Sequence, residues 1–118
     1  MKTKNPGVQR KRSLYAPLHK KKKLMNVALS KDLRIQMKRR SLGIRKGDEV
    51  RMIKGKFKNS QGVVTSVDLK KMKVYVDTAV VKKKSGEQVQ VPIATAKLRI
   101  TKLITTDKSR QKLIQTKV

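Results

Sequence analysis

The 118-residue sequence has no cysteine and a single histidine, and these absences exclude several classes of site. Without Cys there is no disulfide framework, no Cys-based zinc finger and no thiol nucleophile. One His does not form a cluster for a metal, and the 7 Asp and Glu residues are too scattered to favour a two-carboxylate active site. We therefore expect a protein that is not an enzyme and that uses no cofactor and no metal.

Long apolar runs and aromatic residues are also scarce. No stretch approaches the ~18 residues of a membrane span, and the N-terminal region has no apolar segment typical of a secretory signal. With 2 Tyr, 1 Phe and no Trp, the core must be aliphatic and thin. We expect no membrane insertion and modest stability for so small a domain.

Basic residues are what the sequence has in abundance. Lys and Arg number 33 against 7 Asp and Glu, so the formal net charge is +26. Charge of one sign at this level opposes a compact fold until an anionic partner neutralises it. Nucleic acid is the default partner, and an acidic membrane surface or acidic protein tails are the alternatives.

The charge is unevenly distributed along the chain. Residues 1–47 carry 16 basic and 1 acidic residue, residues 48–104 carry 13 and 5, and residues 105–118 carry 4 and 1. The first part is poor in apolar residues, whereas the middle part holds most of the Val and Ile. We predict a basic arm over residues 1–46, a small β domain over 47–104 and a short tail over 105–118.

The arm shows only weak secondary-structure signals. Residues 1–13 have no periodicity and are predicted to be extended or disordered when free. Pro17 suits a helix start, so residues 19–25 are predicted to form one or two helical turns. These turns carry a run of four lysines, so they form only when their charges are neutralised.

A second helix is predicted near the end of the arm. Ser30 is a favourable N-cap for a helix over residues 31–39, which Gly43 is expected to stop. Leu33 and Met37 lie four residues apart and share one face of this helix.

The middle part alternates between apolar and polar residues, which predicts short strands. The predicted strands are residues 50–52, 63–67, 72–76, 89–91 and 98–101. Residues 82–87 (Lys-Lys-Lys-Ser-Gly-Glu) are predicted to be a hairpin tip with Gly86 as its turn residue. Five or six strands in about 55 residues favour a mainly β fold, a small closed or half-closed barrel. Asp107 or Thr106 is expected to cap a last helical turn.

The most informative stretch is residues 47–64, which is predicted to form a strand, a tight connection and a second strand. Gly55 and Gly62 stand where the backbone needs positive φ or close approach, and Asn59 tolerates the left-handed region best among the other residues. The connection also carries Lys54, Lys56 and Lys58. Such a loop is suited to presenting backbone N–H and ammonium groups to phosphates.

This stretch resembles a KOW motif, Gly-Asp-x-Val-x-Val-Ile-x-Gly-x-x-Lys-Gly-x-x-Gly-x-Val. The matching residues are Gly47, Asp48, Val50, Ile53, Gly55, Lys58, Gly62 and Val64. Met52 and Asn59 stand where the pattern has Val and Gly. Because transcription elongation factors also carry the motif, the flanking sequences decide between families.

The flanks are similar to the eukaryotic and archaeal KOW-motif ribosomal protein of the large subunit, the counterpart of bacterial large-subunit protein twenty-four and of eukaryotic protein twenty-six. The similar segments are residues 15–21, 29–34, 40–46, 97–103 and 107–110, so the resemblance spans about residues 10–115. It implies an SH3-like β-barrel with basic extensions, no catalytic activity and no small-molecule substrate. The implied partners are ribosomal RNA, in the 5′ region of the large-subunit RNA near the exit of the nascent-peptide tunnel, and neighbouring ribosomal proteins.

The same resemblance implies a role in subunit assembly and translation, on cytoplasmic ribosomes, with assembly in the nucleus or nucleolus if the chain is eukaryotic. The candidate RNA-binding residues are Arg10, Lys11, Arg12, Tyr15, His19, Lys20, Lys21, Lys22, Lys23, Arg39, Arg40, Arg45, Lys54, Lys56, Lys58, Lys82, Lys83 and Lys84. The candidate backbone positions of the motif loop are Gly55, Asn59 and Gly62.

Lysines supply point charges for affinity, whereas arginine forks suit phosphates or base edges. Tyr15 is placed to stack on an unpaired base, and His19 to stack on a base or to hydrogen-bond RNA. The alternatives for Lys20–Lys23 are a nuclear import signal or a solvated charge run, and the alternative for Tyr15 is packing against the arm's own helix. For His19 and for Lys82–Lys84 the alternative is an ordinary solvated side chain. Packing is the preferred role for Phe57, and Asp48 is expected to tether the motif loop or to pair with a nearby Lys.

Two other functions stay open on the sequence alone. The first is a regulatory KOW module of transcription elongation, which requires a protein partner and fits a charge of +26 poorly. The second is an organellar ribosomal protein with residues 1–31 as a transit peptide. That segment has no acidic residue, as transit peptides do, but it is Lys-rich and contains Pro6 and Pro17.

Overall fold

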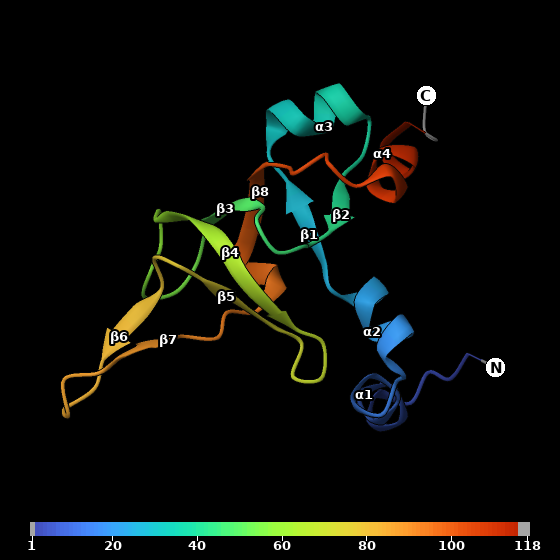
Figure 1. Cartoon of the computed structure of the whole chain (residues 1–118). Coiled ribbons are helices and arrows are strands. Elements are labelled where there is room, and N and C mark those ends of the chain that lie inside the picture. Colours follow the sequence, from blue (N-terminus) through green and yellow to red (C-terminus); the bar gives the residue numbers. More distant parts are fainter. Residues whose placement is uncertain (1, 116–118) are drawn as a thin grey trace.

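The computed structural model describes residues 2–115, so Met1 and residues 116–118, the outer ends of the predicted arm and tail, lie outside the described residues. Figure 1 shows the arrangement of the elements. In chain order they are α1 (Pro6–Leu14), α2 (Leu18–Leu24), β1 (Asn26–Leu29), α3 (Lys31–Met37), β2 (Ser41–Gly43), β3 (Glu49–Met52), β4 (Gln61–Asp68), β5 (Lys73–Val76), β6 (Val80–Lys82), β7 (Gln88–Gln90), the 3-10 turn η1 (Thr95–Lys97), β8 (Leu98–Lys102) and α4 (Lys108–Gln115).

Six strands form one sheet in the order β2-β1-β8-β3-β4-β5, and β6 pairs only with β7. The β1–β8 pairing is parallel, and the other pairings of the sheet are antiparallel. Among the described residues, β2 and β5 are the two edges, and they do not pair with each other. The architecture is therefore a mixed one, a curved open sheet with helices at both ends of the chain, and the strands of its middle part match the mainly β prediction (Figure 1).

All five predicted strands are confirmed, as β3, β4, β5, β7 and β8, and the hairpin tip is confirmed with Gly86 at φ 94°. Two further strands, β1 and β2, come from the predicted arm. β1 lies between β2 and β8, and its Val27 and Leu29 are fully buried. Part of the basic arm is therefore a structural part of the sheet.

The prediction that residues 1–13 are extended or disordered is wrong, because Pro6–Leu14 forms α1. Its start carries the expected signals of a helix N-terminus, since the Asn5 side chain accepts a hydrogen bond from the Gly7 N–H at 3.0 Å and Pro6 occupies the first turn. No residue of α1 is buried, so capping and local propensity hold it rather than an apolar face.

The other helices follow the sequence more closely. α2 begins after Pro17 as predicted, and α3 begins after Ser30, whose hydroxyl accepts from the Leu33 N–H. The predicted end of α3 is wrong: it stops at Met37 because Lys38 adopts the left-handed conformation, with φ 51°. Gly43, the expected stop, lies in β2 instead.

The core is aliphatic and takes residues from every part of the sheet. Its buried members are Met25, Val27, Leu29, Leu42, Ile44, Val50, Met52, Val64, Val74, Val76, Ala79, Ile93, Leu98 and Ile100. Leu33 and Met37 of α3 pack against this core, which confirms the predicted inner face of that helix. Phe57 of the motif loop also packs against the core.

A buried ion pair connects the KOW motif to the C-terminal helix. Asp48 is fully buried and Arg110 of α4 is 2 % exposed, and both carboxylate oxygens accept from the guanidinium at 2.6 Å. Asp48 also accepts from the backbone N–H groups of Arg45 and Ile104, at 3.0 and 3.2 Å. Arg110 donates in addition to the Gly43 carbonyl at 3.0 Å. Asp48 thus tethers the motif as expected, but its partner is an arginine of the tail.

The tail helix itself agrees with the prediction. The Asp107 side chain accepts from the Ser109 N–H at 3.0 Å at the start of α4, which carries Leu113 and Ile114. Ile114 packs against the core beside Arg110.

We expect Arg110→Met to lower the free energy of unfolding by about 3–5 kcal/mol, because it leaves the buried Asp48 carboxylate without its counter-ion. Urea denaturation of the full chain measures this. Arg45→Met is the matched control, since it removes the half-exposed Arg45–Asp107 pair and should cost about 1 kcal/mol or less. Equal losses for the two variants would show that the buried pair does not hold the tail.

Candidate nucleic-acid interface

The helices of the arm carry the first group of predicted contacts. Arg10, Lys11 and Arg12 lie on α1, and His19, Lys20, Lys22 and Lys23 lie on α2, all of them exposed. Tyr15, in the connection, is 80 % exposed. A hollow of about 400 Å³ lies between the helices and is lined by Val8, Lys11, Arg12, Tyr15, Ala16, Pro17 and Lys20. An exposed aromatic ring among basic side chains is suited to stacking an unpaired base.

Lys21 differs from its three neighbours in the lysine run. It is 8 % exposed, and its ammonium donates to the carbonyl of Lys70 in the turn between β4 and β5, at 3.1 Å. The helical phase of α2 turns this one lysine inward while Lys20, Lys22 and Lys23 face outward. Lys21 therefore fastens α2 to the sheet instead of being displayed to a partner.

The motif loop between β3 and β4 is closed by its own backbone. Gly55 and Asn59 have φ values of 93° and 67°, as the sequence indicated. The N–H groups of Lys58, Asn59 and Ser60 donate to carbonyls of Gly55, Met52 and Phe57. The expectation that the loop presents its backbone N–H groups is therefore wrong for these three residues.

What the loop does display is its ammonium groups. Lys54, Lys56 and Lys58 are exposed, and Phe57 turns toward the core. A hollow of about 190 Å³ beside the loop is bordered by Lys54, Lys56 and Lys97 around Phe57, Pro92 and Ile93. The loop is thus a rigid support for lysines.

Gly62 has ordinary φ and is required for a different reason. A Cβ at this position would lie within 2.6 Å of Thr78 Oγ1 and Val76 Cγ1 and would collide with the Asp77 carboxylate. The same carboxylate accepts from the Val63 N–H at 2.9 Å, so it has little freedom to move away. Gly62 lets the start of β4 approach the turn that follows β5.

The hairpin tip carries the next group of predicted contacts. Lys82, Lys83 and Lys84 are exposed. The turn is closed by two backbone hydrogen bonds, from the Lys83 N–H to the Glu87 carbonyl and from the Gly86 N–H to the Lys83 carbonyl. In Figure 1 the β6–β7 hairpin projects at one end of the molecule and α1 and α2 lie at the other. With extents of 48 × 38 × 23 Å, the protein therefore displays lysines at two well-separated ends.

The remaining predicted arginines have different environments. Arg40 is exposed, and Arg39 is partly buried with its Nε lacking an acceptor among the described residues. Arg45 pairs with Asp107, so part of its charge is already neutralised within the protein.

Sequence reasoning missed Arg34, Arg51 and Arg99, which border the same side of the sheet as Arg40. The alternation of residues 98–101 does turn Arg99 away from the core. Its position opposite Arg51 depends on the pairing of β3 with β8, which no local pattern specifies.

Other classes of site find no support in residues 2–115. No three His, Asp or Glu side chains in that range come together in a way that would hold a metal ion. No helix in the same range has the length and apolar character needed to cross a membrane.

We expect Gly62→Ala to lower the free energy of unfolding by about 1–3 kcal/mol, the usual cost of overpacking a closed site. Thermal or urea denaturation measures the loss. Gly43→Ala is the control, because a Cβ at Gly43 would meet its nearest neighbour, Asn26 Oδ1, at an ordinary 3.6 Å. The close approach at Gly62 would be disproved by a G62A variant as stable as G43A.

Comparison with known proteins finds relatives that match nearly the whole chain. Three proteins named large ribosomal subunit protein uL24 are similar to the chain. That of Methanosphaera stadtmanae is 40% identical over 116 residues, which cover 98% of this chain and 99% of that protein. That of Pyrobaculum islandicum is 44% identical over 104 residues, covering 87% and 85%. That of Korarchaeum cryptofilum is 38% identical over 117 residues, covering 99% and 89%.

A family model also matches almost the whole sequence. The match runs over residues 3–117, so it includes the arm, the KOW motif and the tail together. It covers α1 and α2 as well as the sheet. The chain therefore belongs to the family of ribosomal proteins described as L26 in eukaryotes and L24P in archaea.

Proposed function

We propose that the protein is a structural constituent of the large ribosomal subunit that binds its ribosomal RNA and supports subunit assembly and translation. The observation that carries the proposal is the family match over residues 3–117. The charge of +26 supports it independently, because a protein of this charge is matched to a polyanion and not to a neutral partner. Neighbouring proteins of the subunit are its further partners.

The finer assignment rests on the resemblance of the KOW motif and its flanks. It has residues 1–46 as the RNA-binding arm, residues 47–104 as an SH3-like barrel and residues 105–118 as the tail. The order β8-β3-β4-β5, with a bridge between Val74 and Ile93, supports a barrel-like core. The RNA target of the proposal is the 5′ region of the large-subunit RNA, near the exit of the nascent-peptide tunnel.

The candidate residues make different kinds of contact with RNA. The lysines of α2, of the motif loop and of the hairpin tip supply charge, and Tyr15 supplies a stacking surface. The arginines of α1, Arg10 and Arg12, supply forks for phosphate oxygens. Because these groups lie on separate ends of the molecule, the RNA contacts it from more than one side.

The two alternatives have less support. A regulatory KOW module of transcription does not account for a family match that extends over the arm and the tail. A transit peptide over residues 1–31 is disfavoured because its removal would take away β1, whose Val27 and Leu29 belong to the core. The proposed location is the ribosome in the cytoplasm. Nuclear or nucleolar assembly is not part of the proposal, since the relatives named above are archaeal.

Sedimentation of a lysate of the source cell through a sucrose gradient tests the proposal directly. We expect the protein to migrate with free large subunits, with monosomes and with polysomes, and to stay there at high salt. A protein that remained at the top of the gradient, or that sedimented with RNA polymerase, would contradict the ribosomal assignment.

The lysine run of α2 allows a sharper test of RNA binding. We expect Lys20→Gln combined with Lys23→Gln to reduce the salt dependence of binding to large-subunit RNA by about 0.7–0.9 log units for each phosphate that is no longer neutralised. Lys21→Gln is the internal control, because its ammonium is bonded to Lys70. It should leave the salt dependence unchanged and lower the urea midpoint. Equal salt slopes for K20Q/K23Q and for the wild type would exclude a role of these two lysines in binding phosphates.

A further inference from the structure

Four arginines lie on the outer side of the sheet, away from α1 and α2. Arg51 of β3 and Arg99 of β8 are directly paired in the register, and Arg99 also pairs with Ala28 of β1. Their sequence neighbours Val50, Met52, Leu98 and Ile100 are all buried, so Arg51 and Arg99 point to the opposite, outer side. Arg34 of α3 and Arg40, just before β2, border the same side. We call Arg34, Arg40, Arg51 and Arg99 the arginine face.

The arginine face contains two adjoining hollows. One, of about 370 Å³, is lined by Asn26, Ala28, Arg34, Arg40, Ser41, Ile53, Thr95, Ala96, Leu98 and Arg99. The other, of about 330 Å³, is lined by Arg51, Ile53, Asn59 and Arg99. Arg99 and Ile53 border both hollows. Every charged lining residue is an arginine, although lysines are numerous elsewhere in the chain, and none is acidic.

These guanidinium groups have almost no partners within the protein. The side chains of Arg34, Arg40 and Arg99 make no hydrogen bond or ion pair with any described residue, and Arg34 Nε is buried without an acceptor. Among residues 2–115, Arg51 donates only to the Asn59 side chain, at 3.3 Å. Like charges directly opposite each other across two strands are destabilising. The fold therefore holds an arrangement that is unfavourable until an anion joins it.

We propose that the arginine face is a second RNA-binding surface, one that binds the sugar–phosphate backbone and is separate from α1 and α2, from the lysines of the motif loop and from the hairpin tip. The choice of RNA as the anion rests on the proposed function. A guanidinium fork binds phosphate oxygens in a bidentate manner, which an ammonium does not. The amides of Asn26 and Asn59 and the hydroxyls of Ser41 and Thr95 add neutral donors for sugar and phosphate oxygens.

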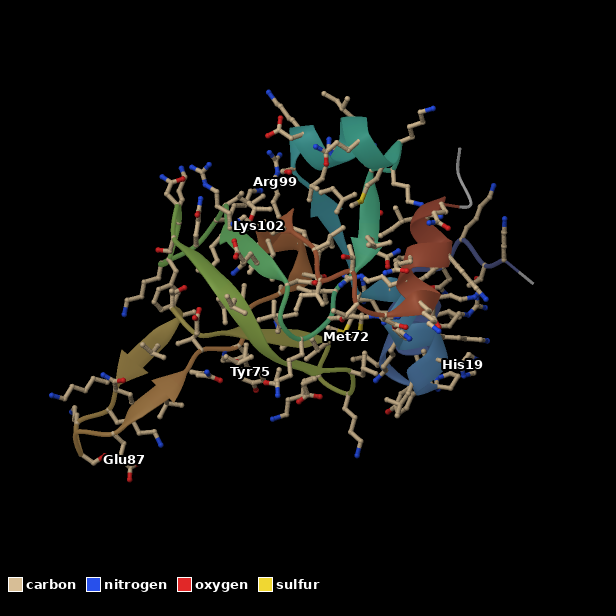
Figure 2. The ribbon with its side chains drawn as sticks, turned by 45° about the horizontal axis from the view of Figure 1, so that its top comes forward. His19, Met72, Tyr75, Glu87, Arg99 and Lys102 are labelled. Atoms are coloured by element: carbon tan, nitrogen blue, oxygen red, sulfur yellow. The ribbon has the colours of Figure 1, made fainter. Side chains whose placement is uncertain are left out.

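The arginine face and α2 lie on different sides of the molecule. Figure 2 shows Arg99 near α3 on one side of the molecule and His19 on α2 on another. Two RNA segments that contact these two sides are held apart by the sheet between them. The protein then joins two separate RNA segments, one at α1 and α2 and the other at the arginine face.

The test uses the full chain and a transcript of the 5′ region of large-subunit RNA from Methanosphaera stadtmanae, whose uL24 is 40% identical to this chain. The variant is Arg51→Gln combined with Arg99→Gln, and the matched control is Lys70→Gln combined with Lys71→Gln. The control removes the same charge from the exposed turn between β4 and β5, which borders neither hollow. Binding is measured over a range of salt concentrations.

We expect R51Q/R99Q to lower the slope of log K against log salt by about 1.4–1.8, which corresponds to two phosphate contacts. K70Q/K71Q should leave the slope unchanged. Arg51→Lys combined with Arg99→Lys should keep the slope and weaken binding, because the charge remains while the planar forks are absent. The thermal midpoint of free R51Q/R99Q should equal or exceed that of the wild type, since repulsion across β3 and β8 is relieved.

The outcomes separate this inference from the function on which it rests. If the wild type binds the transcript no better than a scrambled RNA of equal length, the proposed RNA target fails. If the wild type discriminates but R51Q/R99Q and K70Q/K71Q behave alike, the arginine face is not an RNA surface. Loss of incorporation into subunits by R51Q/R99Q with unchanged RNA binding would instead assign the face to an acidic protein neighbour, which also overturns the inference.

A second measurement locates the RNA without altering any arginine. Because the chain has no Cys, Ser41→Cys creates a unique attachment point for an iron chelate at the edge of the first hollow. Hydroxyl radicals produced there should cleave the bound transcript at a limited set of nucleotides. A cleavage pattern no different from that of the complex without the chelate would overturn the proposal.

Discussion

The buried pair between Asp48 and Arg110 is the interaction on which the rest of the structure depends. It brings together the start of the KOW motif, the end of β2 through the Gly43 carbonyl, and the C-terminal helix. The segment from Gly43 to Asp48 thus shares one desolvated charge pair with a helix residue 62 positions beyond Asp48, and removal of either partner leaves an uncompensated ion. Asp48 directly precedes β3, which lies in the middle of the sheet between β8 and β4.

Outside that pair, the protein leaves its positive charge largely without acidic partners. Two other ion pairs, Arg45 with Asp107 and Lys102 with Glu49, are partly exposed and contribute little to stability. Lysines are displayed on α2, the motif loop and the hairpin tip, where a mobile point charge gives affinity over a wide range of positions. Arg51 and Arg99 lie on paired strands of the sheet, where the backbone register sets their spacing and a planar fork has a defined direction. A polyanion that contacts several of these elements at once reduces the repulsion between positive charges that opposes folding of the free protein.

Local sequence patterns predicted some of the strands and helices and missed others. The alternation at residues 98–101 and 72–76 predicted β8 and β5 because side-chain period 2 is a local property. The positive φ values at Gly55 and Asn59 were anticipated from residue type in the same way. By contrast, α1 was missed because no apolar face marks it and only its Asn5-Pro6 cap does. β1 and β2 were missed because they lie in the basic arm, where a low content of apolar residues predicts no core.

By itself, the sequence determined the charge, the β-rich middle part, the KOW motif and the resemblance to a ribosomal family, since each of these depends on residues close together in the chain. Only the tertiary structure decided that Arg110 is the partner of Asp48, that Lys21 is turned inward to Lys70, and that Arg51 lies opposite Arg99. These relations join residues 48 to 62 positions apart, and such contacts follow from strand pairing and helix phase, which local residue patterns do not encode.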